Sequence, residues 1–283
     1  MTANDLIAKV KNLAPVSHAA LNLVGLLDKP SISNEDIVNV LKFDNVLTAK
    51  LLRACNSPFF GLEEPVSSVD QAVLILGHQQ ILHITLSIAF SGTMATPLPG
   101  YAAEAKELWQ HSLVTALAAE NVARSGTTIE VDGSVAFTAG LLHDIGKVVM
   151  NVVLTTDFQA AVRSRITQDG LSRTDAEREV IGADHAEVGK CLLQSWRLPE
   201  DILEAVEHHH NPVSKPHPKL SSLVHTANCL AHLIGSNLGW ESFAISANAD
   251  AMEALGINQE RMEDLMISCH DSMSQVEHLM QMA

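Results

Sequence analysis

The sequence predicts an all-α protein in which an N-terminal helical subdomain packs on a larger helical bundle. Hydrophobic residues make up 47% of the 283 residues, yet aromatic residues make up only 4%. Ala, Leu, Val and Ile therefore supply the apolar content, which favours helices packed on helices over aromatic-rich strands. Apolar residues recur at helical spacing along most of the chain, and no convincing run of strands is found.

Short amphipathic helices separated by Pro, Gly and Asn are expected in the first hundred residues. The clearest start is Ser33, which can cap a helix together with Asp36 three residues later. Gly77 ends an apolar run that begins after a Ser-Ser pair. The expected helices span residues 4–13, 16–27, 33–43, 45–54, 67–77 and 78–92.

Longer helices are expected after residue 100, and one of them is apolar enough to be buried and contains LLHDIGK. Ser172 can cap the helix that follows it, with Asp175 three residues on. Thr174 with Glu177 is the alternative pair. Pro199 stands at the favoured first position of the next helix. The expected helices span residues 103–123, 132–153, 157–167, 172–196, 199–210, 220–234 and 258–280.

The length and the uneven charge indicate two parts, residues 1–100 and residues 101–283, divided near Pro97 to Gly100. A chain of this length exceeds one domain of roughly 150 residues. The first part holds 6 Lys or Arg against 8 Asp or Glu, and the second holds 12 against 25, within a total of −15. Of the 14 histidines, 11 follow residue 100.

The net charge of −15 argues against a protein that mainly binds the phosphate backbone of nucleic acid, since such binding needs cationic side chains. The N-terminus MTANDLIAKV has no apolar signal core, and no window reaches about 18 uninterrupted apolar residues. The four cysteines are single and widely spaced, which indicates neither a disulfide framework nor a thiolate site. We expect a cytoplasmic protein with no membrane segment.

Histidines, an aspartate and an asparagine on separate expected helices form a candidate site: His111, His143, Asp144, His185, His209, His210 and Asn228. Imidazole and carboxylate suit divalent iron, manganese or zinc. On a helix of 3.6 residues per turn His143 and Asp144 point about 100° apart, so the pair is expected to serve neighbouring positions with Asp144 bridging two metals. An unpaired Asp within the apolar run AFTAGLLHDIGKVVMNVV would cost several kcal/mol. The alternative is that the histidines are incidental surface or core residues.

Several motifs resemble known families. LWQHS, GLLHDIGK, DHAEVGKCLL, AVEHHHNP and LVHTAN follow the order of motifs in the HD superfamily of metal-dependent phosphohydrolases. VLTAKLLRACNSPFFG, followed by VSSVDQAVLILG, resembles the N-terminal signature of the HDOD family, the HD-related output domain of bacterial signalling proteins. The resemblance runs from about Leu13 to Leu233 and implies an HD-type helical bundle in the second part.

The resemblance implies a set of metal ligands: His111, His143, Asp144 as the bridge, His185, and the pair His209 and His210. His208 stays outside this set, and Lys147 corresponds to a lysine that assists phosphate binding in the HD-GYP branch. The implied cofactor is a mononuclear or dinuclear divalent metal, with iron favoured and manganese, zinc or nickel as alternatives.

The sequence departs from the family pattern in two places. Asn228 stands where the superfamily usually has an Asp ligand, and an amide brings no negative charge, so the metal is expected to bind less tightly or one of two ions to be lost. VSKPHPK follows HHNP in place of the GYP segment, so cyclic di-GMP hydrolysis is not expected.

Two functions follow from the resemblance. The first is a regulatory signalling module whose metal is structural or sensory and which receives its signal from a separate protein partner. The second is a metal-dependent phosphohydrolase acting on a phosphate-containing small molecule, with Asp144 and Lys147 as the catalytic residues. The Met-rich helix expected at 258–280 is a core element or a homodimer contact.

Overall fold

Helices form the framework of the protein, and the residues described by the structure contain no β-strand. The structure is a computed structural model that describes residues 1–10, 13, 16–29, 31–128, 130–212, 219–238 and 247–282. The predicted all-α fold is confirmed. The segment 213–218, which holds most of VSKPHPK, lies outside the described residues.

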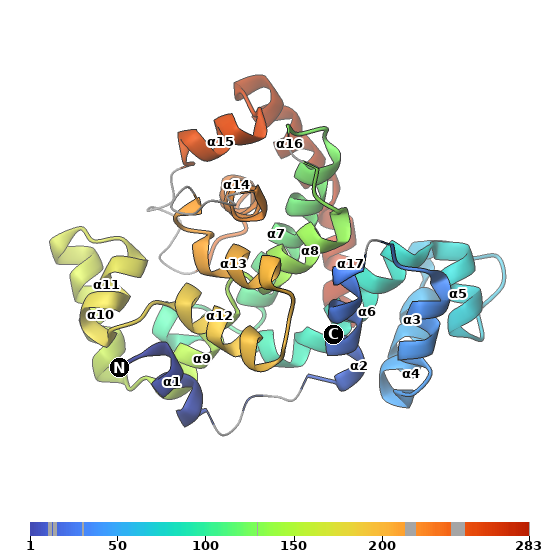
Figure 1. The fold of residues 1–283 in the computed structure, drawn as a ribbon, viewed down its shortest axis with the longest axis horizontal. Helices are drawn as coiled ribbons and strands as arrows, with labels where there is room; N and C mark the ends of the chain where they lie inside the picture. The colour runs from blue at the N-terminus through green and yellow to red at the C-terminus, as the bar shows by residue number, and fades with distance from the viewer. Residues whose placement is uncertain are drawn as a thin grey trace.

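The helices follow one another with short connections (Figure 1). Their bounds are α1 Ala3–Lys9, α2 His18–Gly25, α3 Asn34–Leu41, α4 Asn45–Cys55, α5 Val69–Leu76, α6 His78–Met94, α7 Glu107–Arg124, α8 Gly133–Leu142, α9 Ile145–Val153, α10 Thr156–Asp169, α11 Arg173–Ile181, α12 His185–Ser195, α13 Glu200–His208, α14 Lys219–Leu233, α15 Ala249–Leu255, α16 Gln259–Asp271 and α17 Met273–Met282. Short 3₁₀ turns lie at Leu26–Asp28, Pro58–Phe60 and Pro99–Tyr101.

The caps expected in the first part set the helix starts there. Ser33 and Asp36 form the predicted capping box, in which each side chain accepts from the backbone N–H of the other. Ser68 caps α5, and Gly77 follows that helix with φ 82°, a conformation that favours glycine. Helices α3 and α4 then pack on α5 and α6, at the right of Figure 1.

Helix α7 is the centre of the second part. It packs on α8 and α14, and α16 and α17 lie against it further along. Most of its side chains are buried, including polar ones such as His111 and Glu120. A helix buried around its circumference is a core helix, so the polar residues on it need partners inside the protein.

The two ends of the chain each pack on the other part. Helix α1 lies against α9 and α12, while α17 returns to pack on α6 and α7. A cut at residue 100 therefore separates α1 from the helices that it contacts. The division into residues 1–100 and 101–283 stays a prediction.

Three long helices expected from the sequence are broken in the structure, and those expectations were wrong. The segment 132–153 divides into α8 and α9 at His143 and Asp144. The segment 172–196 divides into α11 and α12 at Gly182, whose φ is 100°, and Asp184 begins the second piece with a capping box. The segment 258–280 divides near Ser272.

Smaller differences concern helix starts. Pro199 is the residue before α13 rather than its first residue, with an extended ψ of 140°. Helix α7 begins at Glu107 rather than near residue 103, after Lys106 in a left-handed conformation. Helix α15 was not anticipated from the sequence.

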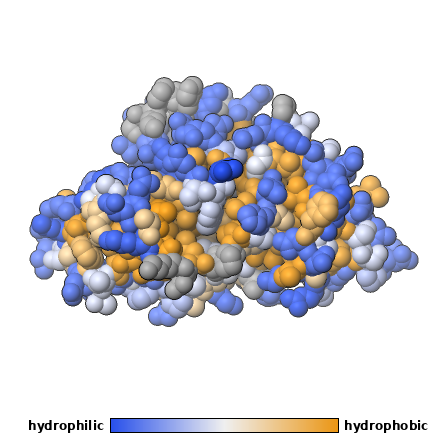
Figure 2. All heavy atoms as spheres, turned by 60° about the horizontal axis from the view of Figure 1, so that its bottom comes forward, coloured by the Kyte–Doolittle hydropathy of each residue, from blue (hydrophilic) through white to orange (hydrophobic). Residues whose placement is uncertain are grey.

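The surface seen from below carries apolar atoms in its middle and mostly hydrophilic atoms around its rim (Figure 2).

One helical stretch, Gly133–Val153, is long and apolar enough to cross a membrane by length and composition, but 83% of it is buried inside the protein. Burial of that extent is the pattern of a core segment, and this stretch is the one that carries His143 and Asp144.

Candidate metal centre

The break between α8 and α9 turns His143 and Asp144 toward the same point. Asp144 leaves the helical conformation, with φ −104° and ψ 9°. His143 Nε2 consequently lies 3.2 Å from Asp144 Oδ2. The expectation that the two side chains diverge by about 100° was wrong, because it assumed an unbroken helix.

Asp144 is the centre of a buried cluster in which its two carboxylate oxygens face different histidines. Oδ2 lies 3.7 Å from His111 Nε2 as well as 3.2 Å from His143 Nε2. Oδ1 lies 3.4 Å from His185 Nε2 and 3.6 Å from His209 Nε2. The structure thus forms two groups that share Asp144, one with His111 and His143 and the other with His185, His209 and His210.

The helices bring these ligands together from distant parts of the sequence. His111 lies on α7, His185 is the first residue of α12, and the pair His209 and His210 comes at and just after the end of α13. Asp144 and the imidazoles of His111, His143, His185 and His209 are each at most 1% exposed, and His210 is half-buried. Polar groups at such depth are stable only with partners.

Hydrogen bonds at Nδ1 fix the orientation of the histidine rings. His111 Nδ1 donates to the Ser236 carbonyl at 2.8 Å, and His143 Nδ1 donates to the Gly140 carbonyl at 2.7 Å. His209 Nδ1 donates to a carbonyl one turn earlier, also at 2.7 Å. With the proton on Nδ1, each Nε2 presents a lone pair to the cluster, which is the arrangement of metal-binding histidines.

Several donor atoms in the cluster are buried without a hydrogen-bond partner among the described residues. They are Nε2 of His111, His143 and His209, and Oδ1 of Asp144. Such atoms carry a desolvation cost of about 1–3 kcal/mol each unless something binds them. Divalent metal bound in the two groups would satisfy all four, and nitrogen donors with one carboxylate fit iron, manganese, zinc or nickel. The residues present therefore fit a bound metal.

Burial keeps most of the imidazoles neutral. It lowers the pKa of His111 to about 3 and the pKa of His209 to about 4. Burial, together with the neighbouring His209 and His185, also holds the pKa of His210 well below its usual value. Neutral imidazole is the form that coordinates a metal.

Two buried carboxylates stay charged because of the groups that surround them. Burial alone would raise the pKa of Asp144, but His143 and Lys147 hold it well below its usual value. Burial would likewise lower the pKa of His185, but the carboxylate of Glu177 raises it to about 10. In return His185 lowers the pKa of Glu177 against the effect of burial.

Lys147 lies inside the cluster rather than at its edge. It is 1% exposed, and its Nζ donates to Asp144 Oδ2 at 2.7 Å. It also lies 5.8 Å from the centre of the Tyr101 ring. A buried ammonium beside the candidate ligands places a fixed positive charge there.

Asn228 and His208 differ in where they lie relative to the cluster. Asn228 is on α14, 4% exposed, and its Oδ1 has no hydrogen-bond partner among the described residues. His232, one turn later on the same helix, has its ring 4.8 Å from that of His111, so this face of α14 points toward the cluster. His208 Nε2 instead lies 2.9 Å from Glu207, outside the cluster.

Glu177 is a site residue that the sequence reasoning missed. Its Oε2 accepts from His185 Nδ1 at 2.7 Å and from the His185 backbone N–H at 2.9 Å. Its Oε1 accepts from the Tyr101 hydroxyl at 3.0 Å. Helix α11 is capped by Ser172 and not by Thr174. The Glu177 carboxylate therefore does not serve in a capping box and instead orients His185.

Close helix packing around the cluster depends on two glycines. A Cβ added at Gly146 on α9 would lie 1.9 Å from the His185 carbonyl oxygen on α12. One added at Gly140 on α8 would lie 2.9 Å from the Cα of Ala116 on α7. Without side chains at these positions, the helices that carry the ligands approach one another at backbone distance.

The fold and the buried cluster define an all-helical protein with an interior site suited to a divalent metal. The chain belongs to the HDOD family, because the family model described as HDOD domain matches residues 13–212. The resemblance predicted from the NSPFFG and HD motifs is confirmed.

Solved structures share the fold over nearly the whole chain. An HDOD domain protein of unknown function from Geobacter sulfurreducens is 24% identical, with a TM-score of 0.75 over 98% of this chain and 95% of that one. A Marinobacter aquaeolei protein named for a suspected role in signal transduction is 21% identical, with a TM-score of 0.80 over 99% of this chain and 65% of that one. A Shewanella amazonensis protein named for a suspected phosphohydrolase activity is 23% identical, with a TM-score of 0.71 over 98% and 97%.

A curated relative resembles this chain without adding a function. An uncharacterised protein of Treponema pallidum is 24% identical over 250 residues, which is 84% of this chain and 46% of that protein. The chain spans less than half the length of the curated relatives it matches.

Proposed function

We propose that this chain is a regulatory signal-transduction protein that binds a divalent metal in the cluster around Asp144. One observation carries the proposal. The Nε2 atoms of His111, His143 and His209 face Asp144 without hydrogen-bond partners among the described residues, while their Nδ1 atoms are anchored on backbone carbonyls. Rings held in this way present lone pairs to a cation rather than to another protein group.

The proposed metal is iron, in a mononuclear or dinuclear site. His111 and His143 would hold one position and His185, His209 and His210 the other, with Asp144 shared between them. The distribution of histidines over both carboxylate oxygens supports the bridging role of Asp144. Manganese, zinc and nickel accept the same donors.

A regulatory role is supported by how closed the site is. Structural metal sites fill their coordination with protein ligands, whereas catalytic sites keep an open position for water and substrate. Here the Asp144 carboxylate and four of the five imidazoles are at most 1% exposed, and Asn228 brings no charge where the family has a carboxylate. The suspected signalling role of the Marinobacter protein agrees with this proposal.

A second candidate function, phosphoester hydrolysis, is favoured by Lys147. A bound metal would supply a Lewis acid that neutralises charge on a phosphoryl group. The Lys147 ammonium, 2.7 Å from Asp144, would add a second positive charge at the same place. The phosphohydrolase activity suspected for the Shewanella protein belongs to this alternative. The reaction would take a phosphate-containing small molecule as substrate.

The metal content of protein purified without added metal tests the main proposal. We expect at least one equivalent of iron by elemental analysis, and loss of it in His143→Ala and Asp144→Ala. His270→Ala is the matched control, because His270 is exposed on α16. Protein that neither retains nor takes up iron, manganese, zinc or nickel would contradict both functions.

Hydrolysis assays on the metal-loaded protein separate the two functions. A regulatory protein shows no turnover of phosphodiesters or nucleotides, and cyclic di-GMP is not an expected substrate. Turnover in the parent that is lost in both Asp144→Ala and Lys147→Gln would establish the enzyme. Turnover gained only in Asn228→Asp would identify a regulatory protein derived from an enzyme.

We further propose that the protein acts in the cytoplasm through a separate signalling partner and self-associates as a homodimer. Large apolar side chains are exposed in the first part, such as Phe43 at 83% in the turn after α3 and Leu74 at 79% on α5, and they support contact with another protein. Light scattering on the purified chain measures the mass directly. A monomer at micromolar concentration would exclude the homodimer.

A further inference from the structure

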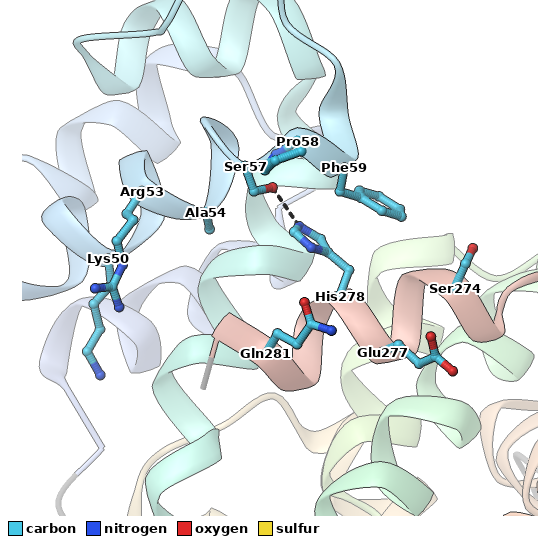
Figure 3. Close-up of a pocket in the computed structure, with 10 residues that line it drawn as sticks. All are labelled: Lys50, Arg53, Ala54, Ser57, Pro58, Phe59, Ser274, Glu277, His278 and Gln281. Carbon is cyan, nitrogen blue, oxygen red and sulfur yellow. Dashed lines mark hydrogen bonds between the residues drawn. The ribbon is translucent and has the colours of Figure 1, made fainter.

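A cavity of about 460 Å³ lies where α4 and the 3₁₀ turn at Pro58–Phe60 face the C-terminal helix α17 (Figure 3). We call it the α4–α17 pocket. It is lined by Lys50, Arg53, Ser57, Phe59, His278 and Gln281 among others. None of its lining residues belongs to the cluster around Asp144. Its volume falls within the range of small-molecule sites.

One wall of the α4–α17 pocket is positively charged. Lys50 and Arg53 stand three residues apart on α4, so they project from one face of the helix. Helix α4 has no acidic residue, and neither cation has an ion pair in the part of the chain that the structure describes. Two unpaired cations facing one hollow are unexpected in a chain of net charge −15. They make this wall suited to an anion.

The other side of the pocket offers an aromatic platform held in place by α17. The Phe59 and His278 rings stack with centroids 4.2 Å apart and planes 10° from parallel, and Phe60 meets His278 edge-on at 5.3 Å. Ser57 Oγ and His278 Nε2 are hydrogen-bonded at 3.1 Å (Figure 3). Phe59 is nevertheless 45% exposed, so part of its ring is free to contact a ligand.

We propose that the α4–α17 pocket binds a small phosphorylated molecule with a planar ring, of the nucleotide class. Lys50 and Arg53 would hold the phosphate, because both ammonium and guanidinium groups donate to phosphate oxygens. Phe59 would stack on the base, since base–aromatic stacking tolerates any base. Gln281, on the wall opposite the two cations in Figure 3, would hydrogen-bond the polar middle of the ligand.

Glu277 allows a test of whether the ligand of the pocket is an anion. It is the carboxylate on the α17 side of the same pocket, and it forms no ion pair with Lys50 or Arg53. Its negative charge opposes an anionic ligand, so Glu277→Gln should tighten binding. A cationic or neutral ligand would show the opposite change or none.

A ligand bound here would also fasten the C-terminal helix to the NSPFF segment. Ser57 and His278 are 221 residues apart in sequence and join the pocket walls through one hydrogen bond. A molecule that contacts α4 and α17 together binds only when α17 is docked. Its binding should therefore raise the unfolding temperature of the full chain.

Calorimetric titration of the full chain, stripped of metal with a chelator, tests the proposal. The probes are GMP, AMP and inorganic phosphate. We expect the nucleotides to bind with a Kd below about 1 mM and more tightly than phosphate. Lys50→Gln and Arg53→Gln should each weaken nucleotide binding about tenfold or more, and the double variant should abolish it. Phe59→Leu should reduce nucleotide affinity to that of phosphate.

Lys42→Gln is the matched control, because Lys42 is an exposed lysine just after α3 and outside the pocket. The proposal is overturned if the chelated parent binds neither nucleotide, or if the double variant binds as the parent does. It is also overturned if binding needs added metal and is lost in His143→Ala, because the ligand would then sit at the metal centre. If the chain binds an acidic peptide but neither nucleotide, the ligand of the pocket is an acidic protein partner and the nucleotide proposal is overturned. Since the pocket shares no residue with the cluster, failure here leaves the proposed metal-binding function standing.

Discussion

Glu177→Gln is the substitution that most directly tests how the candidate metal centre is oriented. Glu177 is 1% exposed and accepts three hydrogen bonds, two from His185 and one from Tyr101. Glutamine has nearly the same shape, and its oxygen can still accept from the histidine. The substitution therefore removes the negative charge while leaving the packing almost unchanged.

The expected effect is on metal affinity. A carboxylate behind a ligating imidazole fixes the ring and makes it a stronger donor, and removal of such a partner typically costs about 10–100-fold in metal affinity. That factor corresponds to about 1.4–2.7 kcal/mol. The metal-free protein should also lose stability by about 1.5–3 kcal/mol, because the buried hydrogen bonds from His185 lose their charged acceptor.

Competition with a chromophoric chelator measures the affinity, and urea unfolding in excess chelator measures the metal-free stability. Glu179→Gln is the matched control on the same helix, since Glu179 is exposed and pairs with Arg165 on the surface. An affinity in Glu177→Gln equal to that of the parent and of Glu179→Gln would refute the view that Glu177 orients a metal ligand through His185.

Three further predictions concern packing, charge and pH. Gly146→Ala should cost about 3 kcal/mol or more in urea unfolding, because its Cβ would lie 1.9 Å from the backbone of α12, whereas Gly92→Ala on α6 has no neighbour within 4 Å and should gain up to about 1 kcal/mol. Asn228→Asp should raise metal affinity roughly tenfold and lower the unfolding temperature in chelator, because a carboxylate at this 4% exposed position is costly without a cation; equal affinities would contradict it. Burial and the charge of Arg124 lower the pKa of His83 to about 3. Between pH 6.5 and pH 3, His83 is therefore protonated in the unfolded chain and neutral in the folded chain. Stability is then lost as the pH falls from 6.5 toward 3, by up to about 1.4 kcal/mol per pH unit. His83→Phe should flatten the acid-unfolding profile by this amount, and parallel profiles would count against it.

Local signals in the sequence predicted where most helices start. The caps of α3 and α5 are formed by Ser33 with Asp36 and by Ser68 with Gly77. Capping interactions act within a few residues, so these helix ends did not depend on the rest of the fold. The break at Gly182 also had a local signal, the Asp184 and Glu187 pair of a capping box, which the pattern of apolar residues concealed.

The break at His143 and Asp144 could not be predicted from local signals. The surrounding run contains neither proline nor a capping pair, and it is apolar enough to continue as one helix. The chain leaves the helical conformation there because Asp144 meets groups on α7, on α12 and just after α13. Tertiary contacts of this kind override helix propensity.

The candidate site was predictable as a set of residue types and not as a geometry. The order of the motifs named all six residues that the structure brings together: His111, His143, Asp144, His185, His209 and His210. Their roles as ligands stay predictions. The sequence did not indicate Glu177 or His232, because each acts through a contact with a histidine on another helix.

The charges in the cluster also explain how this interior can fold before any cation enters. Asp144 pairs with Lys147, and Glu177 pairs with His185, whose raised pKa of about 10 keeps it protonated. Two buried negative charges are therefore matched by two buried positive ones, so the interior carries no net charge from these four groups. A buried charge without a partner would cost several kcal/mol. The metal-free chain should consequently be folded but destabilised by its unpaired Nε2 atoms. Coordination by His185 should release its proton, and metal binding should add stability to a preformed site rather than drive folding.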